Sequence, residues 1–92
     1  MIDVQQTADG DPLEFTVRVT GGGGGTRHHV TMSRDTAGSL GADRHDPARI
    51  IEAAFRFLLD REPKESIMGR FDVTVISRYF PEFEGTLPDY LG

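Results

Sequence analysis

The stretch DPARIIEAAFRFLLDREPKESIMGRFDVTVISRYFPEF, residues 46–83, decides the fold of this chain. It holds almost all of the large apolar side chains outside one N-terminal hairpin, and prolines interrupt it at positions 47, 63 and 81. Proline suits the first position of a helix, whereas later in a helix it ends the hydrogen-bonded ladder. This order of residues predicts a long helix, a break and a second apolar segment.

The long helix is predicted to begin at Asp46 and to run to about Arg61. Asp46 is a suitable N-cap, and Pro47 falls at the first helical position. A wide apolar stripe faces one side of this segment, made of Ile50, Ile51, Ala54, Phe55, Leu58 and Leu59. Such a stripe is typical of a helix that covers a core, and about 15 residues at ~1.5 Å each give a rod of roughly 22 Å.

The segment after Pro63 is predicted to form a short helix to about Arg70 and a further element from Asp72 to Phe80. Residues 73–76 have high strand propensity. A third helix capped by Asp72 is nevertheless favoured over a strand, because a lone strand would need a distant partner. The tail, residues 84–92, is expected to dock on the body through its apolar side chains.

Two runs of alternating residues precede the helix. In residues 13–20 every second side chain is apolar, and residues 26–33 continue the alternation after the glycines 21–25. Alternation of this kind predicts strands with one buried face, and the glycines are expected to form a flexible hairpin loop. A short strand at Ile2 and Val4 is also predicted, and residues 34–45 are predicted to be a polar loop.

These elements predict a single α+β domain over residues 1–92. An N-terminal antiparallel β-hairpin, residues 13–33, is expected to pack on a long amphipathic helix followed by one or two short helices within residues 46–83. The tail, residues 84–92, completes the domain. Because the core of so short a chain is small, a second copy that adds buried area, and hence a homodimer, is expected.

Composition disfavours several classes of function. The chain has 10 basic and 15 acidic residues, a net charge of -5, which disfavours broad attraction to nucleic acid or to an anionic membrane. It has no cysteine, which excludes disulfides and thiol catalysis. Its first residues lack the basic and apolar regions of a secretory signal, and no apolar run is long enough to span a membrane. A cytoplasmic protein is therefore expected.

No catalytic, cofactor-binding or metal-binding residue is predicted. The glycines 21–25 lack the Lys and the following helix of a phosphate-binding loop. His28 and His29 point to opposite faces of a strand and cannot hold one ion together. His28 is expected to be buried and hydrogen-bonded, and His29 to face solvent.

The function that the sequence favours is a non-enzymatic protein-interaction or regulatory module that binds a protein partner or a second copy of itself. Its predicted partner surface consists of Arg56, Arg61, Arg78, Tyr79, Phe80 and Phe83, since arginine and aromatic residues are enriched in interfaces. The alternative is a helix-turn-helix DNA-binding protein that uses residues 63–80. Its recognition helix would offer few polar side chains, and nucleic acid is the less favoured partner.

Two segments carry a resemblance. The run FLLDREPKESI, residues 57–67, and the strand TRHHVT, residues 26–31, are similar to those of a group of small uncharacterised bacterial proteins. The resemblance implies a bacterial, cytosolic protein, and it implies no activity and no catalytic residues.

Overall fold

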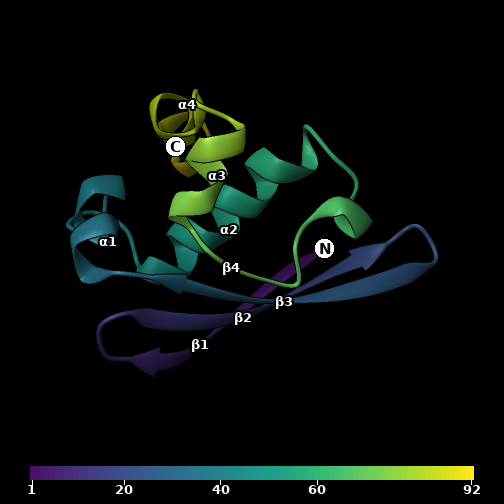
Figure 1. The fold of residues 1–92 in the computed structure, drawn as a ribbon, viewed down its shortest axis with the longest axis horizontal. Helices are drawn as coiled ribbons and strands as arrows, with labels where there is room; N and C mark the ends of the chain where they lie inside the picture. The colour runs from purple at the N-terminus through teal and green to yellow at the C-terminus, as the bar shows by residue number, and fades with distance from the viewer.

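The computed structural model describes all of residues 1–92 and has two layers, a four-stranded sheet and a set of helices on one of its faces (Figure 1). The strands are β1 (Ile2–Asp9), β2 (Leu13–Gly21), β3 (Gly24–Met32) and β4 (Arg70–Asp72). The helices are α1 (Arg34–Leu40), α2 (Pro47–Leu59), α3 (Thr74–Tyr79) and α4 (Phe83–Leu91), with a 3-10 turn, η1, at Lys64–Ser66.

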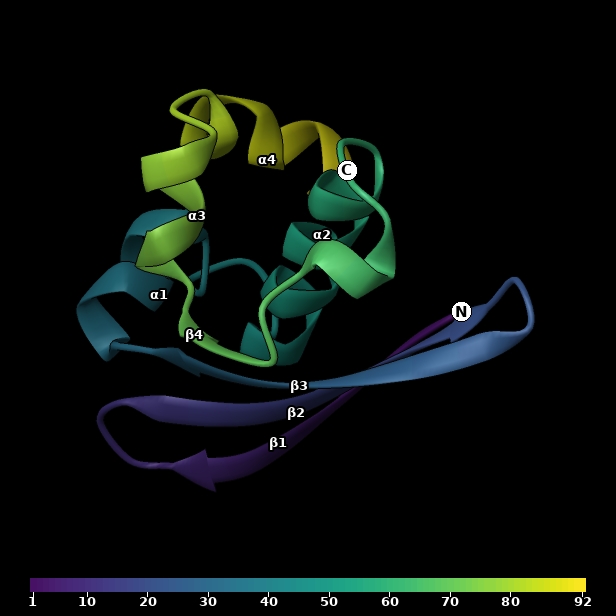
Figure 2. The same cartoon turned by 45° about the vertical axis from the view of Figure 1, so that its right-hand side comes forward.

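The α+β class is therefore confirmed. The finer prediction, an N-terminal hairpin packed on a long helix, is not confirmed. The N-terminal unit has three antiparallel strands, β1, β2 and β3, and β4 extends it by parallel pairing with β3. The longest helix, α2, has 13 residues. Figure 2 shows that the helices lie together over one face of the sheet.

The alternation of β2 and β3 determines which face of the sheet carries the core. Leu13, Phe15, Val17 and Val19 of β2 are buried, and so are Val30 and Met32 of β3. The register joins Phe15 to Val30 and Val17 to His28, so the apolar residues of the two strands lie on the same face. The predicted strand at Ile2 and Val4 is present and extends to Asp9.

The turn between β2 and β3 is tighter than the predicted five-residue loop. Gly21 pairs with Gly24, so only Gly22 and Gly23 remain in the turn. Both have positive φ angles, 62° and 86°, as the two central residues of a type I′ hairpin turn require. Lys64 donates from Nζ to the carbonyl oxygen of Gly21 at 2.8 Å, which links the hairpin tip to η1.

Residues 34–40 form helix α1, so the prediction of a polar loop over residues 34–45 was wrong for this part, and only residues 41–45 are a loop. Ser33 caps the helix, since its Oγ accepts a hydrogen bond from the Thr36 N–H at 3.0 Å. Gly41, with φ of 115°, ends it. The helix was missed because only Ala37 and Leu40 bury apolar side chains, too few to give a helical pattern.

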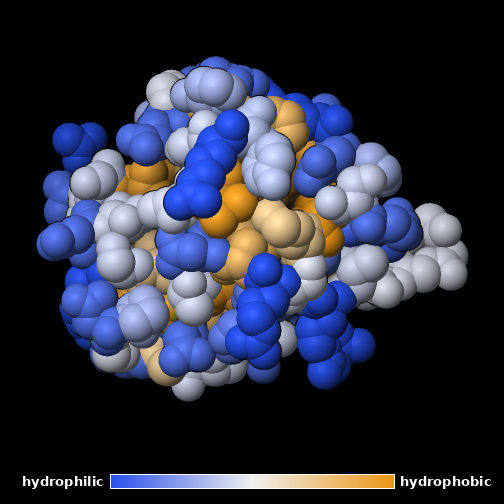
Figure 3. Space-filling model, in the orientation of Figure 1, coloured by the Kyte–Doolittle hydropathy of each residue, from blue (hydrophilic) through white to orange (hydrophobic).

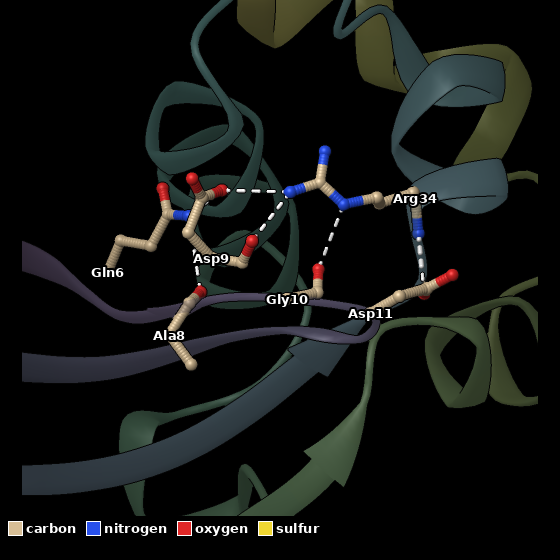
Figure 4. A network of polar contacts seen from close by, with 6 residues as sticks. All are labelled: Gln6, Ala8, Asp9, Gly10, Asp11 and Arg34. Atoms are coloured by element: carbon tan, nitrogen blue, oxygen red, sulfur yellow. Dashed lines mark hydrogen bonds and ion pairs between the residues drawn. The ribbon is translucent and has the colours of Figure 1, made fainter.

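A polar network joins the start of α1 to the turn between β1 and β2 (Figure 4). The Arg34 guanidinium donates to the carbonyl oxygens of Asp9 and Gly10, at 2.6 and 3.0 Å, and forms an ion pair with the Asp9 carboxylate at 3.1 Å. The Arg34 backbone N–H donates to the Asp11 carboxylate at 3.2 Å. These contacts position α1 at one end of the sheet.

Helix α2 begins as predicted and is buried on two sides. Asp46 accepts a hydrogen bond from the Ala48 N–H at 3.2 Å and caps the helix. On the sheet side, the Phe55 ring lies 5.3 Å from His28 and 6.0 Å from Phe71. On the opposite side, the Phe57 ring packs against three C-terminal aromatic rings, those of Phe80, Phe83 and Tyr90, at centroid distances of 5.0 to 5.9 Å.

The predicted short helix from Pro63 to Arg70 is wrong. Only η1 is helical there, and the chain then extends into β4, which pairs with β3 through the register Val30 to Phe71. The His29 N–H donates to the Gly69 carbonyl oxygen at 2.8 Å, and the Val73 N–H to that of Thr31 at 2.9 Å. These bonds satisfy the backbone along the edge of β3. The helix-turn-helix alternative on residues 63–80 thereby loses its first helix.

The remaining C-terminal elements follow the predictions more closely. Residues 74–79 form the favoured helix, α3, and Pro81 lies just beyond its end. The tail docks as helix α4, which buries Phe83, Leu87 and Leu91. None of the helices combines the length and the apolar composition that crossing a membrane requires.

Candidate functional site

An apolar groove beside α3, here called the α3 groove, is the clearest concave feature of the surface. It encloses about 520 Å³ and is lined by ten residues, eight of them hydrophobic. The floor of the groove is part of the hydrophobic core. It is formed by Leu58 of α2, Ile67 just after η1, Phe71 of β4 and Ile76 of α3. The groove therefore rests on a rigid base.

The rim of the α3 groove is also apolar, and it is exposed. Met68 is 43% exposed and Tyr79 is 69% exposed, and with Met1 they are the only large hydrophobic residues so exposed. Figure 3 shows hydrophobic surface in the middle of this face, where Figure 1 places α3 and η1, surrounded by hydrophilic side chains. An exposed apolar surface with a polar border is typical of a binding site.

Asp72 holds α3 at its position beside the groove. Its carboxylate accepts hydrogen bonds from the Thr31 and Thr74 hydroxyls, both at 2.6 Å, and from the Thr74 N–H at 3.1 Å. Partial burial raises the pKa of Asp72, but these hydrogen bonds outweigh the burial and leave the pKa below its ordinary value. The charged carboxylate thus ties α3 to β3.

Only two of the six predicted partner-surface residues line the α3 groove. Tyr79 lies at its exposed rim, and Phe80, which is partly buried, lines it as well. Phe83 is 1% exposed and packs on Phe57 with ring centroids 5.0 Å apart, so it belongs to the core. Its inclusion in a partner surface is corrected accordingly.

Arg61 holds the C-terminal helices on α2. Its guanidinium lies 3.6 Å from the centroid of the Phe57 ring and pairs with the Glu82 carboxylate at 3.2 Å. Cation–π and ion-pair contacts of this kind connect the end of α2 to the start of α4. This arginine therefore has an intramolecular role that the sequence did not reveal.

The other two predicted arginines lie outside the α3 groove. Arg56 is exposed on α2 and pairs with Glu52 at 3.3 Å, an i,i+4 contact along the helix. Arg78 is exposed on α3 and forms no ion pair. Neither lines the groove, so the predicted surface divides into a groove part and a solvated part.

Eight of the ten lining residues fall outside the predicted partner surface, among them Ile67, Met68, Phe71 and Val75. The predicted helix over residues 63–70 concealed the first two, because it placed their side chains on a helical face. The available signal was Ile67-Met68 next to Gly69, an apolar pair in a segment without regular spacing.

His28 is buried, as predicted, with 2% exposure. Its Nδ1 lies 2.7 Å from the Met68 carbonyl oxygen, and its Nε2 lies 2.8 Å from the Thr26 hydroxyl. His29 is partly exposed and contacts Glu14 at 3.1 Å. His28 therefore has a structural role, since it fixes the backbone at Met68 on the groove rim.

The structure contains no group of three or more His, Cys, Asp or Glu side chains placed to hold a metal ion. Comparison with known proteins adds no further constraint on function. No protein-family model, no curated protein and no solved structure matches this chain.

Proposed function

We propose that this protein is a non-enzymatic interaction module, cytoplasmic, that binds a partner protein through the α3 groove. The observation that carries the proposal is the exposed apolar rim, Met68 and Tyr79, above a buried apolar floor. Aromatic and methionine side chains at the centre of a surface are enriched in protein interfaces. A segment that presents one or two apolar side chains is the occupant that suits the groove.

The proposed binding energy comes from burial of the rim. Covering apolar surface stabilises a complex by roughly 25 cal/mol per Å². Methionine adapts to partners of different shape because its side chain is unbranched and flexible. Tyr79 adds a large ring with few rotatable bonds, a side chain whose ordering costs little entropy.

The test is a selection of displayed random peptides on the wild-type protein, followed by fluorescence-polarisation measurement of the selected sequences. Met68→Ala and Tyr79→Ala are expected to weaken binding at least tenfold, about 1.4 kcal/mol. Glu84→Ala is the matched control, since Glu84 is exposed on α4 outside the groove, and it should leave binding unchanged.

The mass of the protein in solution, measured across a range of concentrations, separates the two kinds of partner. A dimer that Tyr79→Ala dissociates identifies a second copy as the occupant. A monomer at every concentration, together with no selected peptide that depends on Met68 and Tyr79, would overturn the proposal.

A further inference from the structure

The face of the sheet that the helices leave uncovered carries a second candidate surface, separate from the α3 groove. The helices lie on the opposite face, as Figures 1 and 2 show. Strand alternation directs Glu14, Thr16 and Arg18 of β2, and Arg27, His29 and Thr31 of β3, away from the core. This uncovered side is here called the open face.

Three exposed arginines lie next to one another on the open face. Arg18 of β2 is the direct cross-strand partner of Arg27 on β3. Arg70 of β4 is the partner of His29, two residues further along β3. With strands about 4.8 Å apart and alternate residues about 6.7 Å apart, the three Cα atoms fall within roughly 12 Å.

These arginines differ from most other cations of the chain. Of the 10 Lys and Arg residues, six form ion pairs within 4.0 Å: Arg34, Arg44, Arg49, Arg56, Arg61 and Lys64. Three of the four that form none are Arg18, Arg27 and Arg70, and the fourth is Arg78. Like charges directly opposite each other on neighbouring strands are destabilising. The repulsion between Arg18 and Arg27 is therefore not offset by an ion pair of either residue within 4.0 Å.

None of the carboxylates of the open face forms an ion pair with the three arginines. Glu14 is engaged with His29, and Asp72 accepts hydrogen bonds from the Thr31 and Thr74 hydroxyls. Asp3, the cross-strand neighbour of Arg18, forms no ion pair. Positive charge consequently gathers at one end of the open face of a protein whose net charge is -5.

We propose that the open face binds an acidic segment of a partner protein through Arg18, Arg27 and Arg70. A guanidinium matches a carboxylate with two parallel hydrogen bonds, and carboxylates on alternate residues of an extended segment recur about every 6.7 Å. A nucleic acid fits less well. The open face has no phenylalanine, tyrosine or tryptophan on which bases stack.

The experiment measures fluorescence anisotropy with two labelled probes, a peptide of ten glutamates and a ten-nucleotide oligouridine, at low and at moderate salt. The wild-type protein is expected to bind the glutamate peptide more tightly than the oligouridine, and less tightly as salt rises. The triple variant Arg18→Gln, Arg27→Gln, Arg70→Gln is expected to lose at least tenfold in affinity for the peptide. Arg78→Gln is the matched control, because it removes an exposed, unpaired arginine elsewhere, and it should bind as the wild type does.

Thermal unfolding shows whether the arginines have a structural role instead. Arg27→Gln removes the repulsion with Arg18, so its melting temperature should equal or exceed that of the wild type. A lower melting temperature, or peptide binding that the triple variant retains, would overturn the proposal. Tighter binding of oligouridine that depends on the three arginines would also overturn it, since the occupant would then be a nucleic acid.

Discussion

The two sides of helix α2 are buried by different kinds of structure. On one side Phe55 packs against the sheet, next to His28 of β3 and Phe71 of β4. On the other side Phe57 packs against Phe83 of α4, and Arg61 covers the Phe57 ring. The first side rests on long paired strands, whereas the second rests on two short helices held to α2 by side chains.

This difference predicts unequal cooperativity. Strands β2 and β3 are joined along their whole length by backbone hydrogen bonds, so the sheet side should open only when the domain unfolds. Helix α4 has nine residues and no side-chain N-cap hydrogen bond, and such an element is marginal without packing. The C-terminal side should therefore open locally at lower free energy.

The largest effect is expected from Phe55→Ala. Truncation of a buried phenylalanine leaves a cavity and typically costs about 3–5 kcal/mol, and a chain of this length has a total stability of roughly 5–14 kcal/mol. Urea unfolding followed by far-ultraviolet circular dichroism should show the midpoint shift for the whole domain. Phe55→Leu, which leaves a smaller cavity, should lose clearly less. Equal losses for the two variants would contradict tight packing on the sheet side.

Phe83→Ala is expected to cost less, close to 3 kcal/mol, the lower end of the range for such truncations. The reason is that α4 can detach as a unit, which limits the cost to the free energy of its docking. Amide hydrogen exchange should show faster exchange in α4 while β2 stays protected. Simultaneous loss of protection in α4 and β2 would mean that the two sides of α2 unfold together.

The smallest effect is expected from acid, and it should fall on the C-terminal side. The pKa values of Glu65 in η1, Asp72 in β4 and Glu82 at the start of α4 are lowered in the folded protein. For Glu82 the causes are hydrogen bonds from its own backbone N–H and then from Arg61. A carboxylate whose pKa is lower in the folded than in the unfolded protein stabilises the folded state at pH values above its unfolded pKa of about 4. This stabilisation is lost as the pH falls through the folded pKa.

Hydrogen exchange corrected for its intrinsic pH dependence should thus show α4 losing protection below about pH 4 before β2 does. Glu82→Gln should reproduce part of this loosening at pH 6, since it removes the charged partner of Arg61. Glu84→Gln is the control, because the exposed Glu84 forms no ion pair. If acid released β2 first, the ranking of the two sides would be reversed.

The candidate site was predictable only in part. Tyr79 and Phe80 were identified because aromatic residues near the end of a short helix are typical of interfaces. Phe83 carries the same local signal, yet it is buried, because Phe57 on the second side of α2 covers it. Met68 and Val75 were missed, since nothing in their spacing indicated that the segment between them would form β4 and pair with β3.

The sequence alone determined the elements whose pattern is local. Alternation specified β2 and β3, because a strand directs successive side chains to opposite faces, and Asp46-Pro47 specified the start of α2. Tertiary structure alone decided that β4 pairs in parallel with β3, that Phe57 packs against the C-terminal aromatic residues, and that Arg18 lies directly opposite Arg27 on the neighbouring strand. A local pattern indicates which side chains are buried, but which distant segment covers them depends on the contacts of the whole chain.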